Sequence, residues 1–393
     1  MTAKQDGYMG NPNLKPTGVE MEFTKEQVKE YIKCSQDPVY FIRNYVKIVS
    51  LDEGLVPFDM YDFQEEMINV IHNNRFFIGK LPRQTGKSTT MISYLLHYVL
   101  FNQSMSVAVL ANKQSVSRDI LGRLQLAYEY LPLWLQQGII AWNKGSIELE
   151  NGSKILASST SASAIRGGSY NVILLDEFAH VSSTIADEFF NSVYPTITSG
   201  SDTKVIMIST PNGLNMFYYY WQGATKKTSE PGKNDYVPFE VHWSQVPGRD
   251  EAWKDGIIKN TSQQQFDQEM ECSFLGSQNT LVNSSKLKIL NWTEPGDKNA
   301  DGLWIYEKPK EGRQYYITVD TARGQGKDYR NNTVSPMVYP TVISTVAKNY
   351  NNAYILVEIN DIGGQVADIL HQDLEYENVM MTVYKGRAGQ TIN

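Results

Sequence analysis

The chain has very little cysteine, with only Cys34 and Cys272 among its 393 residues. The two form no Cys-x-x-Cys pair, so neither a zinc ribbon nor a disulfide framework is indicated, and a reducing cytoplasm fits. Long apolar runs are also missing. None approaches the ~18 residues that a membrane-spanning helix needs, so no membrane partner is expected. Residues 1–18 are polar with glycine and proline, unlike a signal or transit peptide, and we expect residues 1–20 to form a flexible tail.

An excess of positive charge is missing as well. The chain has 36 Lys and Arg against 43 Asp and Glu, a net charge of -7. This charge argues against a strongly basic nucleic-acid coat, but it allows a localised basic channel. Apolar residues make up 41% and charged residues 20%, as in ordinary globular proteins. The length indicates two or three domains.

A phosphate-binding loop is indicated at residues 81–88, which read Leu81-Pro82-Arg83-Gln84-Thr85-Gly86-Lys87-Ser88. An apolar stretch at 76–78 precedes it and a helix is expected over 89–101, which gives the order strand, loop, helix. In such loops backbone N–H groups cradle phosphates, the lysine reaches the β- and γ-phosphates, and the hydroxyl ligates magnesium. The helix N-terminus adds partial positive charge. Leu81 replaces the first glycine of the general pattern. The candidate nucleotide-binding residues here are Arg83, Gln84, Thr85, Gly86, Lys87, Ser88 and Thr89.

A second motif follows the apolar run at 171–175, which ends in Asp176-Glu177. Buried parallel strands read as continuous hydrophobic runs, and their functional carboxylates lie at the C-terminal end. Asp176 is therefore a candidate magnesium ligand, and Glu177 is a candidate base for the water that attacks the γ-phosphate. The other interpretation is two acids capping a core strand, but two matching motifs in the expected order favour the nucleotide site.

Strands and helices alternate along the chain, which predicts an α/β fold with a largely parallel sheet and helices on both faces. Two helices are expected between residues 23 and 49, the first capped by Thr24 with Gln27. Another helix, over 58–71, contains Gln64. Further helix is expected over 114–130. The expected strands lie at 106–110, 147–149, 154–157, 172–175 and 204–209.

Five motifs occur in order: Arg83-Gln84-x-Gly86-Lys87-Ser88, Trp142 to Leu149, Arg166-Gly167, Asp176-Glu177, and Ser209 to Gly213. Together they resemble the large terminase subunit of tailed, myovirus-type bacteriophages, over about residues 20–385. That family packages viral DNA into a prohead. The resemblance implies a RecA/ASCE-like P-loop NTPase that uses ATP and Mg2+, and it makes the missing loop glycine ordinary.

The resemblance also implies roles for single residues. Arg83 and Arg166 are the two candidates for an arginine finger, which stabilises transition-state charge; an ordinary ion pair is the alternative for each. Gln64 resembles the adenine-reading glutamine, unless it is a solvated helical residue. Ser209 and Thr210 would sense the γ-phosphate, unless they are a simple strand-end turn.

The C-terminal part resembles the family's ribonuclease-H-like nuclease, an α/β domain. Strands expected at 315–319 and 353–357 end in Asp320 and Glu358, with Asp328 as a third candidate ligand. Carboxylates on adjacent strand ends can hold two Mg2+ or Mn2+ ions for phosphodiester hydrolysis. The family's third carboxylate would lie beyond Asn393, and only 333–339 remains of an expected hairpin. The nuclease is therefore expected to be partial and weak.

We expect four parts along the chain. They are a helical subdomain at 1–56, a P-loop ATPase core at 57–240, a segment at 241–280 that returns to a lid or linker subdomain, and the partial nuclease at 281–393. The resemblance implies double-stranded viral DNA, portal protein and the small terminase subunit as partners. It also implies a homo-oligomeric ring, a pentamer, on the portal. It places the protein in the cytoplasm of an infected bacterial host and outside the mature virion. A helicase-like ATPase and a truncated, non-cleaving binding form are the alternatives.

Overall fold

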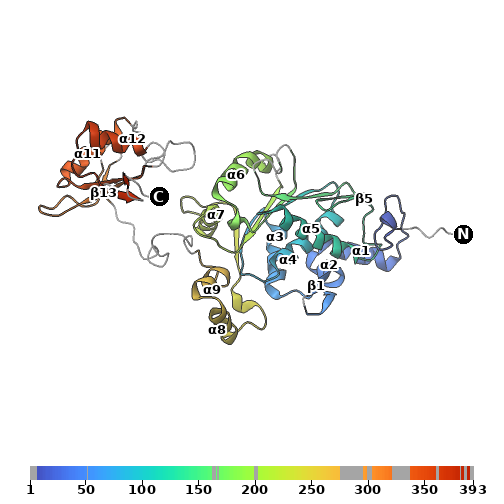
Figure 1. Ribbon diagram of the computed structural model, residues 1–393. Coiled ribbons are helices and arrows are strands. Elements are labelled where there is room, and N and C mark those ends of the chain that lie inside the picture. The colour runs from blue at the N-terminus through green and yellow to red at the C-terminus, as the bar shows by residue number, and fades with distance from the viewer. Residues whose placement is uncertain are drawn as a thin grey trace. The chain divides into compact units, whose positions relative to one another are not determined.

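The computed structural model divides into two compact units, Met1–Ile289 and Leu290–Asn393, coloured along the chain in Figure 1. It describes residues 7–50, 52–161, 165, 168–198, 202–274, 295–298, 303–320, 337–359, 363–380, 382–384 and 387–389. None of the helices within these residues has the length and apolar character needed to cross a membrane.

An eight-stranded sheet forms the centre of the first unit, in the order β10-β3-β9-β8-β4-β7-β6-β5. Neighbours from β10 to β7 pair in parallel, whereas β6 and β5 continue the sheet in antiparallel fashion. Its strands are β3 (Phe76–Lys80), β4 (Ser106–Ala111), β5 (Ile139–Trp142), β6 (Ser146–Leu149), β7 (Lys154–Ser159), β8 (Val172–Asp176), β9 (Lys204–Ser209) and β10 (Val237–Glu240).

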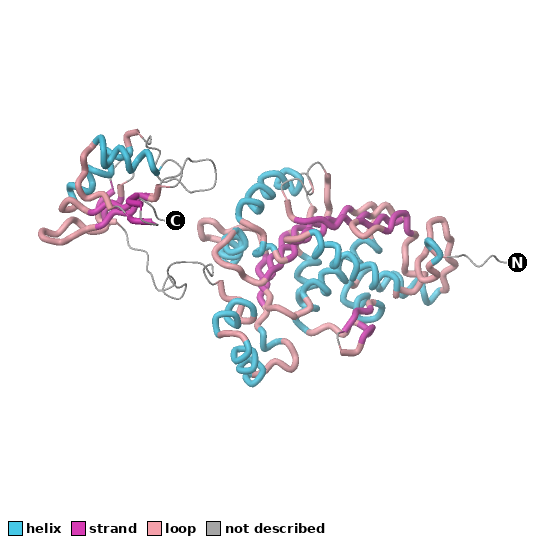
Figure 2. Tube along the Cα trace, viewed as in Figure 1, coloured by secondary structure: helices cyan, strands magenta, loops and turns pink. Residues whose placement is uncertain are grey.

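Helices cover both faces of this sheet, as the tube in Figure 2 shows. On β4, Val107 and Val109 face the core shared with α4 and α5, while Ala108 and Leu110 face the core shared with α6 and α7. Strands buried on both sides need apolar residues at every position, which is why they read as unbroken hydrophobic runs. The helices of the unit are α1 (Lys25–Gln36), α2 (Pro38–Tyr45), α3 (Asp62–Asn73), α4 (Lys87–Phe101), α5 (Gln114–Glu129), α6 (Ser183–Thr198), α7 (Met216–Thr225), α8 (Glu251–Asn260) and α9 (Gln263–Glu269).

The predicted α/β fold with a largely parallel sheet and helices on both faces is confirmed. The capping box at the start of α1 is also present: the Gln27 N–H donates to Thr24 Oγ1 at 3.2 Å, and the Thr24 N–H donates to Gln27 Oε1 at 3.0 Å. The region at 1–56 is not helical throughout, because β1 (Lys47–Ser50) and β2 (Gly54–Pro57) form an antiparallel hairpin.

The expected flexible tail is wrong for residues 7–18, which lie along the outer strand of the sheet. The Ile139 N–H donates to Lys15 O at 2.9 Å, and the Gly18 N–H donates to Glu150 Oε1 at 2.8 Å. Leu14 is buried with only 4% of its surface exposed. The edge of β5 offers unpaired backbone groups, and a polar segment that satisfies them needs no helix or strand propensity of its own.

The second unit contains β13 (Tyr316–Val319) and β14 (Tyr354–Val357), paired in parallel, with a core that includes residues of α11 (Tyr339–Asn349) and α12 (Gly363–Asp368). Two short pairs accompany them: β11 (Asp297–Lys298) with β12 (Trp304–Ile305), and β15 (Thr382–Tyr384) with β16 (Arg387–Gly389). The strand expected over 333–339 is wrong at its end, because Tyr339 begins a helix. Pro340 occupies the first turn, where a missing N–H breaks no hydrogen bond. Residues 333–336 lie outside the described part of the chain.

Candidate functional site

The candidate site lies at the C-terminal edge of the parallel strands in the first unit. The phosphate-binding loop follows β3, the two acids end β8, and Ser209-Thr210 end β9, which lies between those two strands. Three segments that are far apart in the sequence therefore meet at one edge of the sheet. This is the edge at which parallel α/β sheets place their ligands.

The loop between β3 and α4 depends on two residues in the left-handed region. Gly86 has φ 72° and Gln84 has φ 57°. A Cβ atom on Gly86 would lie 2.6 Å from Nε2 of Gln64, so glycine is required by both conformation and space. Gly86 precedes the first residue of α4, so Lys87 and the helix N-terminus lie at the mouth of the loop. The sequence predicted the order strand, loop and helix, with the helix expected to begin at Thr89, two residues later than it does.

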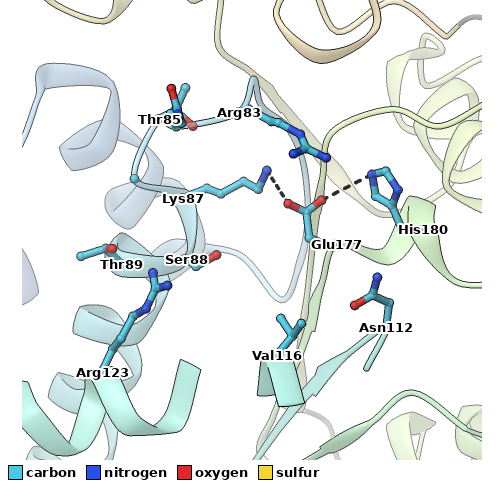
Figure 3. A pocket seen from close by; sticks show the side chains of 12 residues that line it. Arg83, Thr85, Lys87, Ser88, Thr89, Asn112, Val116, Arg123, Glu177 and His180 are labelled. Atoms are coloured by element: carbon cyan, nitrogen blue, oxygen red, sulfur yellow. Dashed lines mark ion pairs between the residues drawn. The ribbon is translucent and has the colours of Figure 1, made fainter. Parts of the chain in front are cut away.

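A cavity of about 490 Å³ opens over the loop (Figure 3). All seven predicted loop residues line it, together with Glu177 and four further side chains that the sequence did not single out. The loop residues are Arg83, Gln84, Thr85, Gly86, Lys87, Ser88 and Thr89, and the further side chains are Asn112, Val116, Arg123 and His180.

The central contact of the cavity joins the loop lysine to the second acid of the pair. Lys87 Nζ lies 2.7 Å from Glu177 Oε1, and the Lys87 side chain is only 8% exposed. Burial favours a higher pKa for Glu177, but attraction and hydrogen bonding from Lys87, followed by His180 and the Thr210 backbone, outweigh it and lower that pKa. Glu177 is therefore a carboxylate, as a group that accepts a proton from water must be.

The other carboxylate, Asp176, has the opposite electrostatic surroundings. Burial, followed by the adjacent negative charge of Glu177, raises its pKa to about 6. The Ser88 hydroxyl donates to Asp176 Oδ2 at 3.1 Å, whereas the buried Oδ1 has no hydrogen-bond partner among the residues that the structure describes. An unsatisfied buried acceptor beside a serine hydroxyl is a donor set that suits Mg2+, which prefers oxygen ligands. Ser88 and Asp176 could therefore hold a magnesium ion.

His180 and Thr210 surround the second oxygen of Glu177. The Thr210 N–H lies 3.4 Å from Glu177 Oε2, and the Ser209 hydroxyl lies 3.3 Å from the same oxygen. His180 Nε2 is 3.0 Å from the Thr210 hydroxyl and 3.8 Å from Glu177 Oε2. Glu177 itself has φ 52°, which turns its side chain back toward β9. The strand-end pair Ser209-Thr210 thus contacts the second acid directly.

The structure describes only one of the two arginine-finger candidates, Arg83. Arg83 lines the cavity, and its Nε donates to Glu269 Oε2 of α9 at 2.6 Å. Arg166 lies outside the described residues, as does Gly167. Arg123 of α5, which the sequence did not single out, also lines the cavity (Figure 3). It pairs with Asp119 at 2.7 Å.

Gln64 is buried behind the loop, with 2% of its surface exposed. Its Nε2 donates to Thr85 O at 2.9 Å, and its Oε1 accepts the Tyr61 N–H at 2.9 Å. Both ends of the amide are used within the chain, and Gln64 is absent from the cavity lining. In this structure it holds the loop and the start of α3 together, and its role in reading adenine stays a prediction.

In the second unit, Asp320 and Glu358 follow the paired strands β13 and β14. Val319 is opposite Val357 in the register, and the Glu358 N–H donates to Val319 O at 2.8 Å, so the two acids occupy neighbouring strand ends. Asp328 lies outside the described residues. Among the residues that the structure describes, no cluster of three or more metal-ligating side chains is found. The nuclease site and the ribonuclease-H-like fold stay predictions.

Spacing along the chain indicates some of the residues that the sequence analysis missed, whereas others have no local signal. His180 comes three positions after Glu177 on the same turn, so its place near the acid could have been found from spacing. Asn112 directly follows β4, whose neighbour in the sheet is β8. Arg123 and Glu269 come from remote segments, and only the folded chain brings them to the loop.

Comparison with known proteins identifies the family of the chain. A family model described as "Terminase large subunit, T4likevirus-type, N-terminal" matches residues 78–289, more than half of the chain. The chain is 24% identical over 233 residues to the large terminase subunit of Thermus virus P23-45, covering 52% of this chain and 46% of that protein. It is 23% identical over 201 residues to tripartite terminase subunit 3 of human herpesvirus 7, covering 49% and 29%. It thus spans less than half the length of these curated relatives.

Solved structures with a similar chain path include two phage proteins. The ATPase domain of the Thermus phage P74-26 large terminase aligns with a TM-score of 0.44 and 20% identity, covering 53% of this chain and 92% of that one. The HK97 bacteriophage large terminase aligns with a TM-score of 0.46 and 16% identity, covering 57% and 47%. On the match of the family model, this chain belongs to the T4-like family of terminase large subunits.

Proposed function

We propose that the chain is an ATP-driven DNA-packaging motor, which hydrolyses ATP to translocate double-stranded viral DNA into a prohead. The observation that carries the proposal is the cavity in which a phosphate-binding loop faces Glu177, while the neighbouring Asp176 is buried and accepts a hydrogen bond from Ser88 of the loop. Membership of the terminase large-subunit family supports DNA packaging as the work that hydrolysis drives.

The residues of the cavity divide the chemistry among them. Lys87 and the loop N–H groups bind the phosphates, with the α4 N-terminus adding positive charge. Ser88 and Asp176 would hold Mg2+, which neutralises charge on the β- and γ-phosphates when it is bound. Glu177 accepts the proton of the attacking water, and His180 with Thr210 orients that carboxylate.

The contact between Lys87 and Glu177 defines a resting arrangement. The Lys87 ammonium and the Glu177 carboxylate neutralise each other, with Nζ 2.7 Å from Oε1. A triphosphate competes for Lys87, because several phosphate charges attract the ammonium more strongly than one carboxylate does. Glu177 is then released from the lysine and keeps only its contacts to the β9 end and His180. Binding of substrate thereby frees the base.

The remaining assignments rest on the same family membership. Proposed partners are double-stranded DNA, portal protein, the small terminase subunit and copies of the chain in a pentameric ring, in the cytoplasm of an infected bacterium. Arg83 and Arg166 remain the candidate arginine fingers, and Gln64 remains the candidate adenine reader. Asp320, Asp328 and Glu358 are proposed ligands of Mg2+ or Mn2+ in an endonuclease site. The four-part division at residues 56, 240 and 280 also stays a proposal.

Two variants test the ATPase. Lys87→Ala removes the main phosphate partner, so it should abolish both hydrolysis and tight nucleotide binding. Glu177→Gln keeps the size of the side chain but cannot accept a proton, so it should bind ATP while losing turnover. Hydrolysis would be followed as phosphate release and binding with a fluorescent nucleotide. Near wild-type turnover by Glu177→Gln would show that another group is the base.

A further inference from the structure

The segment that contains α8 and α9 contacts the phosphate-binding loop at Arg83 and Gln84. The contacts come from Arg249, just before α8, and from Glu269, the last residue of α9. The loop residues that they hold are Arg83 and Gln84, which precede Arg249 and Glu269 by about 165 to 186 positions. No sequence motif predicts these contacts.

Arg249 holds the backbone of the loop. Its two terminal nitrogens donate to Arg83 O at 3.2 and 3.3 Å, and one of them also donates to Gln84 O at 2.9 Å. The guanidinium lies 4.7 Å from the ring centroid of Trp253, which stacks on buried Trp243. The packed tryptophans therefore fix the direction of the arginine fork. A loop that directs its backbone N–H groups toward phosphate leaves its carbonyl groups in need of other donors, and Arg249 supplies those donors.

Glu269 holds the same loop through a side chain as well as through the backbone. The Arg83 N–H donates to Glu269 O at 3.0 Å, and Arg83 Nε donates to Glu269 Oε2 at 2.6 Å. The Glu269 side chain is only 14% exposed, whereas that of Arg83 is 57% exposed. Within the pair the carboxylate is thus the more enclosed group and the guanidinium the one with room to move.

We propose that Glu269 is a positioning residue that competes with the γ-phosphate of ATP for Arg83, so that the loop and the α8–α9 segment are coupled through one guanidinium. This inference rests on the proposed ATPase function of the cavity. Arg83 lines that cavity while it is paired with Glu269. When Arg83 turns to the γ-phosphate, α9 loses its side-chain contact to the loop, while Arg249 keeps the backbone in place.

The proposal predicts a preference that depends on the third phosphate. ADP has no γ-phosphate, so it does not compete for Arg83 and leaves the contact to Glu269 intact. Glu269→Gln removes the competing charge and retains an oxygen acceptor of the same size. Because an ion pair with an exposed partner contributes modestly, this change should strengthen binding of a non-hydrolysable ATP analogue by about fivefold. Binding of ADP should stay within about twofold, since it does not use the guanidinium.

The experiment measures the dissociation constants of ADP and of the β,γ-imido analogue of ATP on the full chain, by displacement of a fluorescent nucleotide. It compares the wild type, Glu269→Gln, Arg83→Ala and the double variant. Glu251→Gln is the matched control, because it removes the same charge from α8 at a side chain that is 76% exposed and pairs with Lys254. Lys87→Ala checks separately that the nucleotide occupies the cavity.

Selective strengthening for the ATP analogue that disappears in the Arg83→Ala background would support the proposal, since it shows that Glu269 acts through Arg83. Three results would overturn it: equal changes for both nucleotides, weaker binding of the ATP analogue, or the same change in the absence of Arg83. If Lys87→Ala bound nucleotide as the wild type does, the proposed ATPase site would fail instead. The two failures are therefore distinct.

Discussion

Replacing Asp176 with asparagine should stabilise the fold and abolish its chemistry at the same time. The pKa of Asp176 is raised from an ordinary value of 3.8 to about 6, first by burial and then by the charge of Glu177. Its Oδ1 is buried and has no hydrogen-bond partner within the described part of the chain. The ionised form of Asp176 therefore lowers the stability of the fold. We attribute this cost to the proposed role of Asp176 as a magnesium ligand.

The magnitude follows from linkage between protonation and folding. Between pH 3.8 and about 6 the native state binds a proton that the unfolded chain has released, so stability falls as pH rises through this interval. A shift of about two units corresponds to about 3 kcal/mol above pH 6. Asparagine carries no charge, so Asp176→Asn should be about 1–3 kcal/mol more stable than the wild type at pH 8 and nearly equal to it at pH 4.

Urea unfolding followed by tryptophan fluorescence at pH 4, 6 and 8 would measure this difference. Asp187→Asn is the control, because it removes a carboxylate from an exposed position on α6. ATP hydrolysis should be lost in Asp176→Asn, as an amide is a poor magnesium ligand. The reasoning would be refuted if Asp176→Asn were less stable than the wild type at pH 8, or if the difference did not change with pH.

Three further predictions concern the orientation of the base, the contact with DNA and the second unit. His180→Ala should lower kcat by about tenfold with little change in KM, because Glu177 loses its orienting contact. His180→Gln should restore part of the rate. A change confined to KM would contradict the orienting role of His180. Binding to double-stranded DNA should weaken steeply as salt rises and should show little sequence preference. The reason is that an acidic chain must contact the phosphate backbone through local clusters of basic residues. Filter binding that does not depend on salt would contradict this prediction. Plasmid cleavage with Mg2+ or Mn2+ should be lost in Asp320→Ala, because the metal ions lose a carboxylate ligand. Cleavage that persists in this variant would show that Asp320 is not part of the nuclease site.

The motif residues of the site could be predicted because their chemistry depends on local sequence. Gly86 must adopt a positive φ and Lys87 must follow it at the helix start, so spacing alone identifies both. The run that ends in Asp176 is buried throughout β8, which is the burial that its apolar composition predicts. Parallel strand ends then bring these residues together without further information.

The partners of those residues could not be predicted in the same way. Nothing in the sequence distinguishes Glu269 and Arg249 from ordinary charged surface residues. Their contact with the loop depends on how the α8–α9 segment folds back onto it. The tail at 7–18 is ordered by the backbone edge of β5, which composition does not reveal. Gln64 was identified as important, but its amide binds Tyr61 and Thr85 within the chain rather than facing the cavity.

The most direct test of the central claim is the rate of ATP hydrolysis by the wild type and by Glu177→Gln, each with and without double-stranded DNA. A packaging motor should hydrolyse ATP with magnesium, and its rate should rise several-fold when DNA is added. Glu177→Gln should bind ATP yet show no hydrolysis under either condition. A wild-type rate that DNA leaves unchanged, or a Glu177→Gln rate equal to that of the wild type, would contradict the account.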